Sequence, residues 1–409
     1  MPAQVIDELC RREGAKVRAA LVRRFGDLAL AEDLLQEAYL KALAVWPQSG
    51  VPDNPAAWLS TVARNLGLDI VRRDARMLPD AEQVLEQLEA EPPPDADDNF
   101  IEDDRLRLIF VCCHPALGAK AQAMLALRSL CGLSTREIAR AYLETEAGAA
   151  QRMVRAQKKI SEAKIPFEIP APTQLAERLA LVLEVIYLVF NEGYGATSGA
   201  QLLRTDLGAE AIRLGRMLAE LMPDQAEPQG LLALMLLQHA RRDARVDRDG
   251  ALTPLELQDR SSWHAAEIAE GQARIDLALS LGAAGPYQIQ AAIAALHASA
   301  TRAADTDWPQ IADLYAALLR YWPTPVVELN AAVARGMADG PAHGLALIDA
   351  LDARGELART HYLPAARADL LRRLGRNHEA VCAFEQALAL VSNDVERAYL
   401  QRQRDLLGE

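Results

Sequence analysis

Residues 132–160, GLSTREIARAYLETEAGAAQRMVRAQKKI, decide how the central part of the chain folds. Two short apolar patterns at helical spacing are separated by a break, which predicts two helices joined by a turn. Ser134 or Thr135 can cap the first helix, and Glu137 suits its positive end. This spacing is typical of a helix-turn-helix.

The second helix of this pair combines an apolar side with a basic side. We expect Met153, Val154 and Ile160 to turn inward. Side chains three or four residues apart share a helix face. The predicted DNA-facing set is Gln151, Arg152, Arg155, Lys158 and Lys159. The alternative is an ordinary solvated basic helix.

The composition of the whole chain favours helix throughout. It has 409 residues, enough for two or three domains with their own cores, and 51% are hydrophobic with few aromatic residues. We therefore expect an all-α protein.

The longest apolar run is too short to span a membrane, and the N-terminus lacks an apolar signal core, so we expect a cytoplasmic protein without membrane contact. Five cysteines without regular spacing favour reduced thiols.

Charge is distributed in blocks, although the net charge is -13. The segment 80–104 has 11 acidic residues and no basic residue; the rest of residues 1–165 has 22 basic residues against 14 acidic ones. Residues 166–409 have 22 basic and 32 acidic residues. The acidic segment includes three consecutive prolines, which predicts a poorly ordered linker between two basic helical units.

Two helices are predicted before this linker. In residues 25–43, Asp33 and Glu37 form a like-charge pair on one helix face, which suits a basic docking partner or an ordinary solvated surface. Asn54 and Pro55 begin a second helix. Its predicted inward stripe is Leu59, Val62, Leu66 and Ile70. Its predicted base-binding set is Trp58, Asn65, Arg72 and Arg73, with Thr61 beside them. Aromatic, amide and guanidinium groups stack on or hydrogen-bond to unpaired bases, but Trp58 alone is more typical of a core.

Residues beyond 175 are predicted to be helical, with repeating stretches around Leu318, Leu351 and Leu388. Their spacing, and a turn at Gly375, resemble tetratricopeptide repeats. The predicted division is residues 1–77, linker 78–104, residues 105–165, a helical extension 175–300 and repeats 301–409.

Several sequence patterns resemble metal or catalytic sites only weakly. Cys112, Cys113 and His114 lack a second ligand pair, and the loop 245–256 has Arg245 where calcium binding needs a carboxylate, so we expect no metal and no cofactor. No catalytic motif is apparent, so we expect no enzyme. Polar groups in the segment 249–264 can brace an interdomain contact. The residues assigned to that contact are Asp259, Arg260 and Trp263.

Together, three stretches resemble an extracytoplasmic-function, or group IV, RNA polymerase sigma factor. AEDLLQEAYLKAL (31–43) is similar to conserved region 2.2, WLSTVARNLGLDIVRR (58–73) to regions 2.3 and 2.4, and residues 132–160 to region 4.2. The likeness covers about residues 5–165. The rest resembles the helical extension of the long subgroup, in which LVFNEGYGATSG and DGALTPLELQDRSSWH are familiar strings.

The resemblance implies a function for each stretch. Asp33, Gln36 and Glu37 fall where the family binds the clamp of core RNA polymerase. The loop 47–53 and the set around Asn65 fall where it captures the -10 element, and the basic helix falls at the -35 groove. Gly148, Ala149 and Ala150, in the opening turn of that helix, differ from the residues usual in the family. Its base preference at the -35 element therefore cannot be inferred from common family members.

The expected function is promoter recognition within the polymerase, without chemistry. A C-terminal domain that controls activity in cis is a further hypothesis, and its repeats suit a protein or peptide partner. The alternative is a conventional DNA-binding regulator with a tetratricopeptide-like interaction domain.

Overall fold

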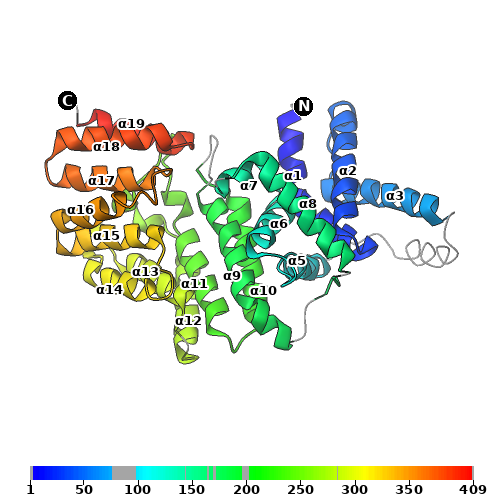
Figure 1. The fold of residues 1–409 in the computed structure, drawn as a ribbon, viewed down its shortest axis with the longest axis horizontal. Helices are drawn as coiled ribbons and strands as arrows, with labels where there is room; N and C mark the ends of the chain where they lie inside the picture. The colour runs from blue at the N-terminus through cyan, green and yellow to red at the C-terminus, as the bar shows by residue number, and fades with distance from the viewer. Residues whose placement is uncertain are drawn as a thin grey trace. The chain divides into compact units, whose positions relative to one another are not determined.

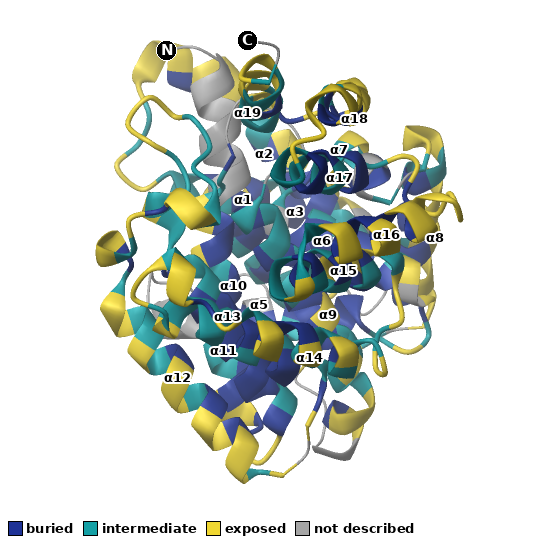
Figure 2. Ribbon diagram, turned by 90° about the vertical axis from the view of Figure 1, so that its left-hand side faces the viewer, coloured by how far each residue is buried: buried dark blue, intermediate teal, exposed yellow. Residues whose placement is uncertain are grey.

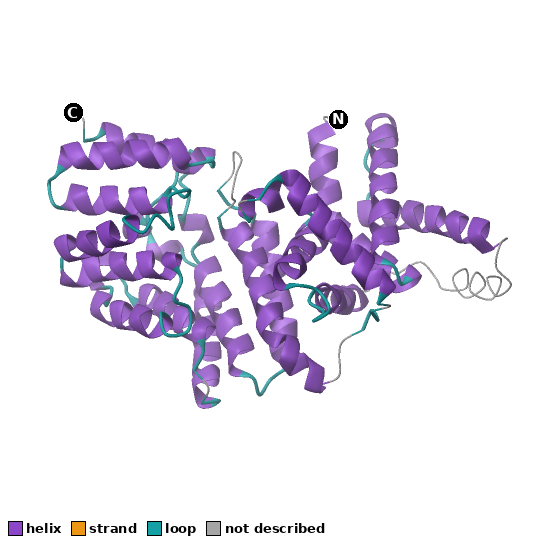
Figure 3. Cartoon of the chain, viewed as in Figure 1, coloured by secondary structure: helices purple, strands orange, loops and turns teal. Residues whose placement is uncertain are grey.

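The computed structural model describes residues 3–75, 98–142, 144–163, 165–168, 172–195, 202–282 and 284–407. Within these ranges the chain forms α-helices and short 3-10 turns (Figure 1), and the pairing of Val246 with Leu252 is an isolated bridge rather than a strand. Figure 3 shows the helices in purple and no strand in the described part. The prediction of an all-α fold is confirmed. None of the described helices combines the length and apolar character that crossing a membrane requires.

The chain divides into two compact units, residues 1–189 and 190–409. The first unit contains α1 (Ala3–Phe25), α2 (Leu28–Ser49), α3 (Pro55–Ala75), α5 (Asp98–Cys112), α6 (Ala119–Cys131), α7 (Thr135–Ala141) and α8 (Glu146–Glu162). The boundary falls inside α9 (Pro172–Tyr194).

The second unit continues with helices joined by short connections. They are α10 (Thr205–Leu221), α11 (Ala226–His239), α12 (Ala265–Ser280), α13 (Pro286–Ser299), α14 (Trp308–Leu318), α15 (Pro325–Asp339), α16 (Pro341–Asp352), α17 (Tyr362–Arg373), α18 (Asn377–Leu390) and α19 (Asp394–Asp405). The 3-10 turns are η1 (Arg242–Ala244), η2 (Leu255–Leu257), η3 (Arg260–Ser262) and η4 (Ala303–Asp305). In Figure 2, α12 shows buried and exposed bands in alternation, as expected of a helix with one face in a core.

Local capping explains where the first helices begin. The Asp27 carboxylate accepts hydrogen bonds from the amides of Ala29 and Leu30, at 2.8 and 3.0 Å, and so starts α2. At the start of α3, Asn54 accepts from the Ala57 amide at 3.0 Å, while Pro55 occupies the first helical position. The predicted helix start at Asn54 and Pro55 is confirmed.

The buried side of α3 differs from the predicted stripe. Leu59 is buried as expected, but Val62, Leu66 and Ile70 are only half-buried. Ala63, Gly67 and Leu68 are buried instead. A Cβ on Gly67 would lie 2.4 Å from Cζ of Phe25, so the glycine allows close helix packing that larger side chains prevent. The small residues Ala63 and Gly67, which were not part of the predicted apolar stripe, thus help to determine which side of α3 faces inward.

The predicted linker is shorter than expected at its C-terminal end. Its residues 78–97 lie outside the described residues, but α5 begins at Asp98, inside the range assigned to the linker. Asp104 is buried, and its carboxylate lies 2.9 Å from Arg23 Nε and 2.8 Å from Arg107 Nη1. Two guanidinium groups thus compensate the buried charge of Asp104, a residue that sequence composition alone assigns to a solvated linker.

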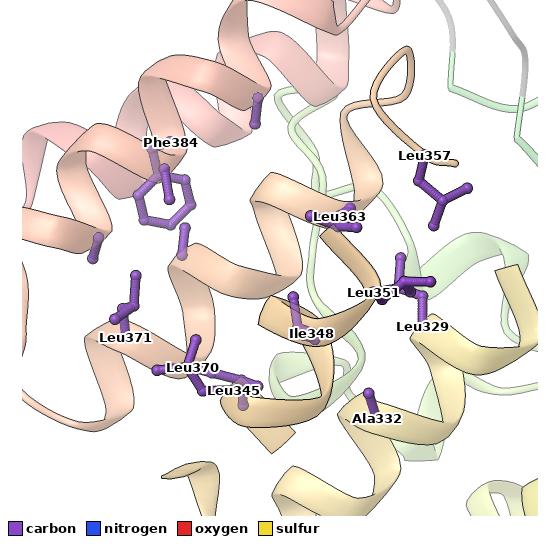
Figure 4. Close-up of a cluster of buried hydrophobic side chains, with 14 of the residues drawn as sticks. Leu329, Ala332, Leu345, Ile348, Leu351, Leu357, Leu363, Leu370, Leu371 and Phe384 are labelled. Carbon is purple, nitrogen blue, oxygen red and sulfur yellow. The ribbon is translucent and has the colours of Figure 1, made fainter. Parts of the chain in front are cut away.

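Helices of the second unit pack against their neighbours in the chain. Figure 4 shows one core, which extends from leucines of α15 and α16 through leucines of α17 to Phe384 of α18. Gly336 of α15 and Gly344 of α16 permit close contact, since a Cβ on Gly344 would lie 2.6 Å from the Gly336 Cα. Gly375 has φ 71°, a conformation that favours glycine, and makes the predicted turn between α17 and α18.

Candidate nucleic-acid interface

The helix α7 begins with reciprocal hydrogen bonds. The Ser134 amide donates to the Glu137 carboxylate at 2.6 Å, and the Glu137 amide donates to the Ser134 hydroxyl at 3.2 Å. This capping box satisfies two amides at the start of a seven-residue helix. Thr145 caps α8 through a 3.2 Å bond from the Gly148 amide. These caps fix the starts of α7 and α8.

One side of α8 is packed and the other carries the predicted DNA-binding residues. The buried residues are Ala149, Met153, Ala156 and Ile160. Val154 was expected to be buried with them, but this prediction is wrong: it is 62% exposed. It follows Met153 directly, and adjacent residues of a helix point about 100° apart. The apolar stripe therefore passes through alanines at positions 149 and 156.

The exposed side of α8 borders a hollow of about 310 Å³ against the start of α6. Its polar lining is Gln151, Arg152, Arg155 and Lys159, and the remainder comes from Leu117, Gly118, Ala121, Gly148 and Ala156. Four members of the predicted -35 set thus meet in one place. Lys158 does not line the hollow; its ammonium lies 3.6 Å from Glu162 on an exposed flank.

Glu144 holds two of the nearby cations. Its Oε1 lies 2.5 Å from Lys120 Nζ and 3.1 Å from Arg152 Nη2. The hydrogen bond from Lys120, followed by the charges of Arg152 and Lys120, lowers the pKa of the Glu144 carboxyl despite desolvation. Arg152 is therefore oriented before any ligand binds, and an incoming phosphate would compete with a carboxylate for it.

The predicted -10 residues occupy α3. Asn65, Arg72 and Arg73 are exposed, and Arg72 Nη1 lies 3.4 Å from an Asp69 carboxylate oxygen. Trp58 is half-buried and meets the ring of Trp46 edge-to-face, with centroids 5.2 Å apart. The ring of Trp58 is thus held by a core partner, while the other three side chains remain accessible.

The loop predicted to capture a base is shorter than 47–53. The helix α2 continues to Ser49 and includes Pro47, so only residues 50–54 connect α2 to α3. The amide of Gly50, whose φ is 82°, closes the helix by donating to the Trp46 carbonyl. Because a proline in the last turn removes a single helical donor, it does not end the helix where the sequence indicated.

The exposed side of α2 contains the predicted polymerase-binding residues Asp33, Gln36 and Glu37. The same helix also exposes Leu40, with 59% of its surface accessible, and Leu43. Leu40 lies seven residues after Asp33 and therefore on the same face. These leucines were not among the predicted binding residues, because a leucine in an amphipathic helix is normally assigned to the core.

Sequence reasoning also missed the buried acid that precedes Asp33. Glu32 Oε2 lies 2.5 Å from Arg18 Nε, and Glu32 Oε1 lies 2.9 Å from Arg128 Nη2. Arg18 also donates to the Ser129 carbonyl at 2.5 Å. Burial raises the pKa of Glu32, but the charges and hydrogen bonds of the two arginines outweigh this and lower it overall. A carboxylate within the apolar stripe of α2 was the available signal.

The three predicted interdomain residues have different surroundings. Arg260 Nη1 donates to the carbonyls of His297 and Ala300, at 2.5 and 2.6 Å, and Nη2 donates to Thr306 Oγ1 at 3.3 Å. Its guanidinium carbon lies 5.1 Å from the ring centre of buried Trp263. Asp259 instead accepts locally from the Ser261 amide and hydroxyl, at 3.0 and 2.7 Å. Arg260 and Trp263 are thus brought together, and Asp259 caps η3.

The possible metal ligands remain dispersed. Cys112 and Cys113 are buried, and burial raises the pKa of the Cys112 thiol to about 12. Among the described residues, no three His, Cys, Asp or Glu side chains form a group that could hold a metal ion. Asp247, in the calcium-like loop, accepts hydrogen bonds from the amides of Asp249 and Ala251.

Comparison with known proteins identifies two segments. Residues 9–77 match the family model of sigma-70 region 2, and residues 178–279 match a family of unknown function, DUF6596. An uncharacterized protein of Rhizobium meliloti (strain 1021) is 49% identical over 393 residues, which cover 95% of this chain and 92% of that protein. No solved structure matches the chain.

A more distant relative carries a functional name. The probable ECF RNA polymerase sigma factor SigI of Mycobacterium tuberculosis, in strains H37Rv and CDC 1551, is 26% identical over 160 residues. The alignment covers 38% of this chain and 54% of SigI. The region 2 match spans most of α1 and all of α2 and α3. Together with the similarity to SigI, it identifies the chain as a member of the extracytoplasmic-function group of the sigma-70 family with a C-terminal helical extension.

Proposed function

We propose that this protein binds core RNA polymerase and directs promoter recognition at the -10 and -35 elements, without chemistry of its own. The observation that carries the proposal is the exposed face of α2 within the sigma-70 region 2 match, where Asp33, Gln36 and Glu37 project to solvent. A helix face that combines carboxylates with exposed Leu40 and Leu43 suits a partner that offers both cations and apolar surface.

The arrangement of α3 supports binding of the -10 element. Asn65 offers amide donors and acceptors, and Arg72 and Arg73 offer guanidinium groups for the backbone of an unpaired strand. Trp58 has a structural contact with Trp46, so we assign it to supporting the site rather than to being the main stacking surface.

The arrangement of α8 supports binding of the -35 element. Gln151, Arg152 and Arg155 carry amide and guanidinium groups, which can make bidentate contacts with base edges in a major groove. Lys158 and Lys159 are suited to phosphate contacts, which position a protein on DNA without reading its sequence. The helix-turn-helix assignment of α7 and α8 is part of this proposal.

The decisive experiment reverses the charge on α2. Purified protein with Asp33→Lys and Glu37→Lys is mixed with bacterial core polymerase, and co-elution and run-off transcription are measured. Because both carboxylates are exposed, the fold should persist while polymerase association and transcription are lost.

The matched control reverses the charge at Glu220 and Asp224, two exposed carboxylates of the second unit with the same spacing. This variant should associate and transcribe like the unaltered chain. Retained polymerase association by the Asp33 and Glu37 variant, with unchanged circular dichroism, would instead favour the alternative of a conventional DNA-binding regulator.

We also propose that the extension controls activity in cis and that its helical repeats, of tetratricopeptide type, bind a protein or peptide. Support comes from two apolar cores that join successive helices, one from α13 to α15 and one from α15 to α19, and from the Gly375 turn. A cytoplasmic location follows from the proposed partners, polymerase and promoter DNA.

A further inference from the structure

A cavity of about 170 Å³ lies within the second unit, between α11, η2, α13 and α14. Its apolar wall is formed by Leu237, Leu255, Ile293 and Ala294. Its polar wall is formed by Gln238, Arg241, Trp263, Gln290, His297 and Tyr315. One side of the cavity therefore suits a hydrocarbon body, and the other offers several hydrogen-bonding groups.

Two rings that line the cavity, Trp263 and His297, each carry a nitrogen without a hydrogen-bond partner among the described residues. Trp263 is only 6% exposed, and its Nε1 is buried and unpaired; His297 Nδ1 is likewise buried and unpaired. Buried polar groups nearly always have a partner, because desolvation without a replacement bond is unfavourable. The indole N–H can only donate, so its missing partner must be an acceptor.

The charge of the wall favours an anion. Arg241 lines the cavity, and none of the described residues around it contributes a carboxylate. Arg241 is oriented by a hydrogen bond to the Tyr194 hydroxyl. His297 contributes no charge near neutral pH, since burial, followed by the nearby charges of Arg241 and Arg260, lowers its pKa to about 4. A carboxylate would therefore find one positive charge, the indole donor and a neutral imidazole.

Trp263 and His297 are held firmly. The Arg260 guanidinium lies over a face of the Trp263 ring and donates to the His297 carbonyl, so one guanidinium positions both. The His297 ring meets Trp308 edge-to-face, with centroids 5.2 Å apart. Both rings are thus fixed in orientation before a ligand binds, which reduces the entropic cost of binding.

The volume limits the ligand to about one ring. Dry protein cavities of about 150 Å³ accommodate a benzene molecule. We propose that this cavity binds a small organic monocarboxylate with a single ring or a branched hydrocarbon body, its carboxylate on Trp263 Nε1 and Arg241. Arg241 and Trp263 lie inside the DUF6596 match, whereas α13 and α14, which also line the cavity, lie beyond it. A bound ligand would therefore contact both the matched segment and the helices that follow it.

The test uses the full-length protein and benzoate as the probe, with benzamide as a neutral molecule of the same shape. Isothermal titration should show benzoate binding about tenfold or more tightly than benzamide, because charge-assisted hydrogen bonds are roughly twice as strong as neutral ones. With indole-labelled protein, the Trp263 resonance, among five tryptophans, should shift most on adding benzoate.

Trp263→Phe removes the donor and keeps an aromatic ring, so benzoate affinity should fall about tenfold. Trp322→Phe is the matched control, because Trp322 packs on Tyr287 and does not line the cavity; its affinity should not change. The indole spectrum of the unaltered chain provides the answer even if Trp263→Phe does not fold.

Three results would overturn the proposal. The first is no binding by the intact chain of benzoate or of branched aliphatic carboxylates at about 10 mM, which corresponds to a negligible affinity. The second is equal affinity for benzoate and benzamide. The third is a benzoate shift at other indoles with none at Trp263. None of these outcomes depends on polymerase binding, so they leave the proposed promoter function untouched.

Discussion

At the scale of the residue, Glu32 shows how one buried carboxylate connects helices that are far apart in the chain. It joins Arg18 of α1 to Arg128 of α6, and Arg18 continues to the Ser129 carbonyl. Such a pair is weak evidence of net stabilisation, but removing one member leaves a buried charge uncompensated. Arg18 is 3% exposed, so it cannot recover full hydration when its partner is lost.

Replacing Glu32 with Gln should therefore destabilise the first unit by about 3 kcal/mol. Hydrogen exchange in α2 and α6 under increasing denaturant measures this change without assuming that the whole chain unfolds in one step. The control is Asp33→Asn, at an exposed neighbour, with an expected change within about 0.5 kcal/mol. Equal effects of the two substitutions would contradict the assigned role of Glu32.

The same carboxylate predicts a pH dependence. Its pKa in the folded protein lies below the ordinary 4.5, so the charged form contributes stability above that pH and loses it as the pH falls through the folded value. The opening free energy measured by exchange in α2 and α6, corrected for the intrinsic exchange rate at each pH, should therefore decrease in acid below about pH 4.5 in the unaltered chain. In the Glu32→Gln protein, the loss of stability caused by protonation of this carboxylate should disappear. If the acid dependence of Glu32→Gln matched that of the unaltered chain, the assigned role of Glu32 would be wrong.

At the scale of the element, α7 is too short to persist by its own propensity, so its capping box is important. Ser134→Ala should destabilise α7 by about 1 kcal/mol, because alanine lacks the hydroxyl that accepts from the Glu137 amide and keeps only the backbone amide that donates to the Glu137 carboxylate. Faster amide exchange in residues 135–141 measures this. Thr135→Ala, one position later, is the control and should have less effect; the reverse order would make Thr135 the cap.

The two sides of α8 predict different consequences for DNA binding. Arg155 lines the hollow with Gln151, whereas Lys158 lies on the flank beside Glu162. Arg155→Ala should weaken binding by about 1–3 kcal/mol and relax preference at a promoter position. Lys158→Ala should weaken binding equally on all sequences and reduce the salt slope by about one. Titrations on promoter and scrambled DNA at several salt concentrations distinguish these effects.

At the scale of the whole molecule, α9 matters for any truncation of the extension. Arg178 of α9 donates to the Phe110 carbonyl at 3.5 Å, and Glu184 contributes to raising the pKa values of Cys113 and Tyr142, although burial is the larger cause. The first part of α9 therefore belongs to the first unit, residues 1–189, even though the DUF6596 match begins at residue 178.

A chain ending at residue 195 should consequently fold its first unit, while one ending at residue 174 should expose the surface that α9 covers. If the extension controls activity in cis, run-off transcription by the 1–195 chain should differ at least severalfold from that of the full chain. Circular dichroism and polymerase co-elution show whether both are folded. Equal rates and promoter selectivity would remove the proposal of control in cis.

The sequence by itself determined the helical fold and the starts of individual helices. Repeated apolar spacing predicts helices, while local groups such as Asn54 with Pro55, Ser134 with Glu137, and Gly375 fix their ends through contacts within a few residues. The exposed residues of α2, α3 and α8 were accessible to the same reasoning, because a helix face follows from residue spacing alone.

Only the tertiary structure decided which faces were buried and which distant groups met. Gly67 brings α3 close to Phe25, Val154 falls outside the packed stripe, and Glu32 meets Arg18 and Arg128. The cavity beside Trp263 likewise requires helices separated by tens of residues. Helical periodicity specifies the direction of a side chain about its own axis, whereas packing and charge compensation depend on the neighbouring helix, which no local pattern identifies.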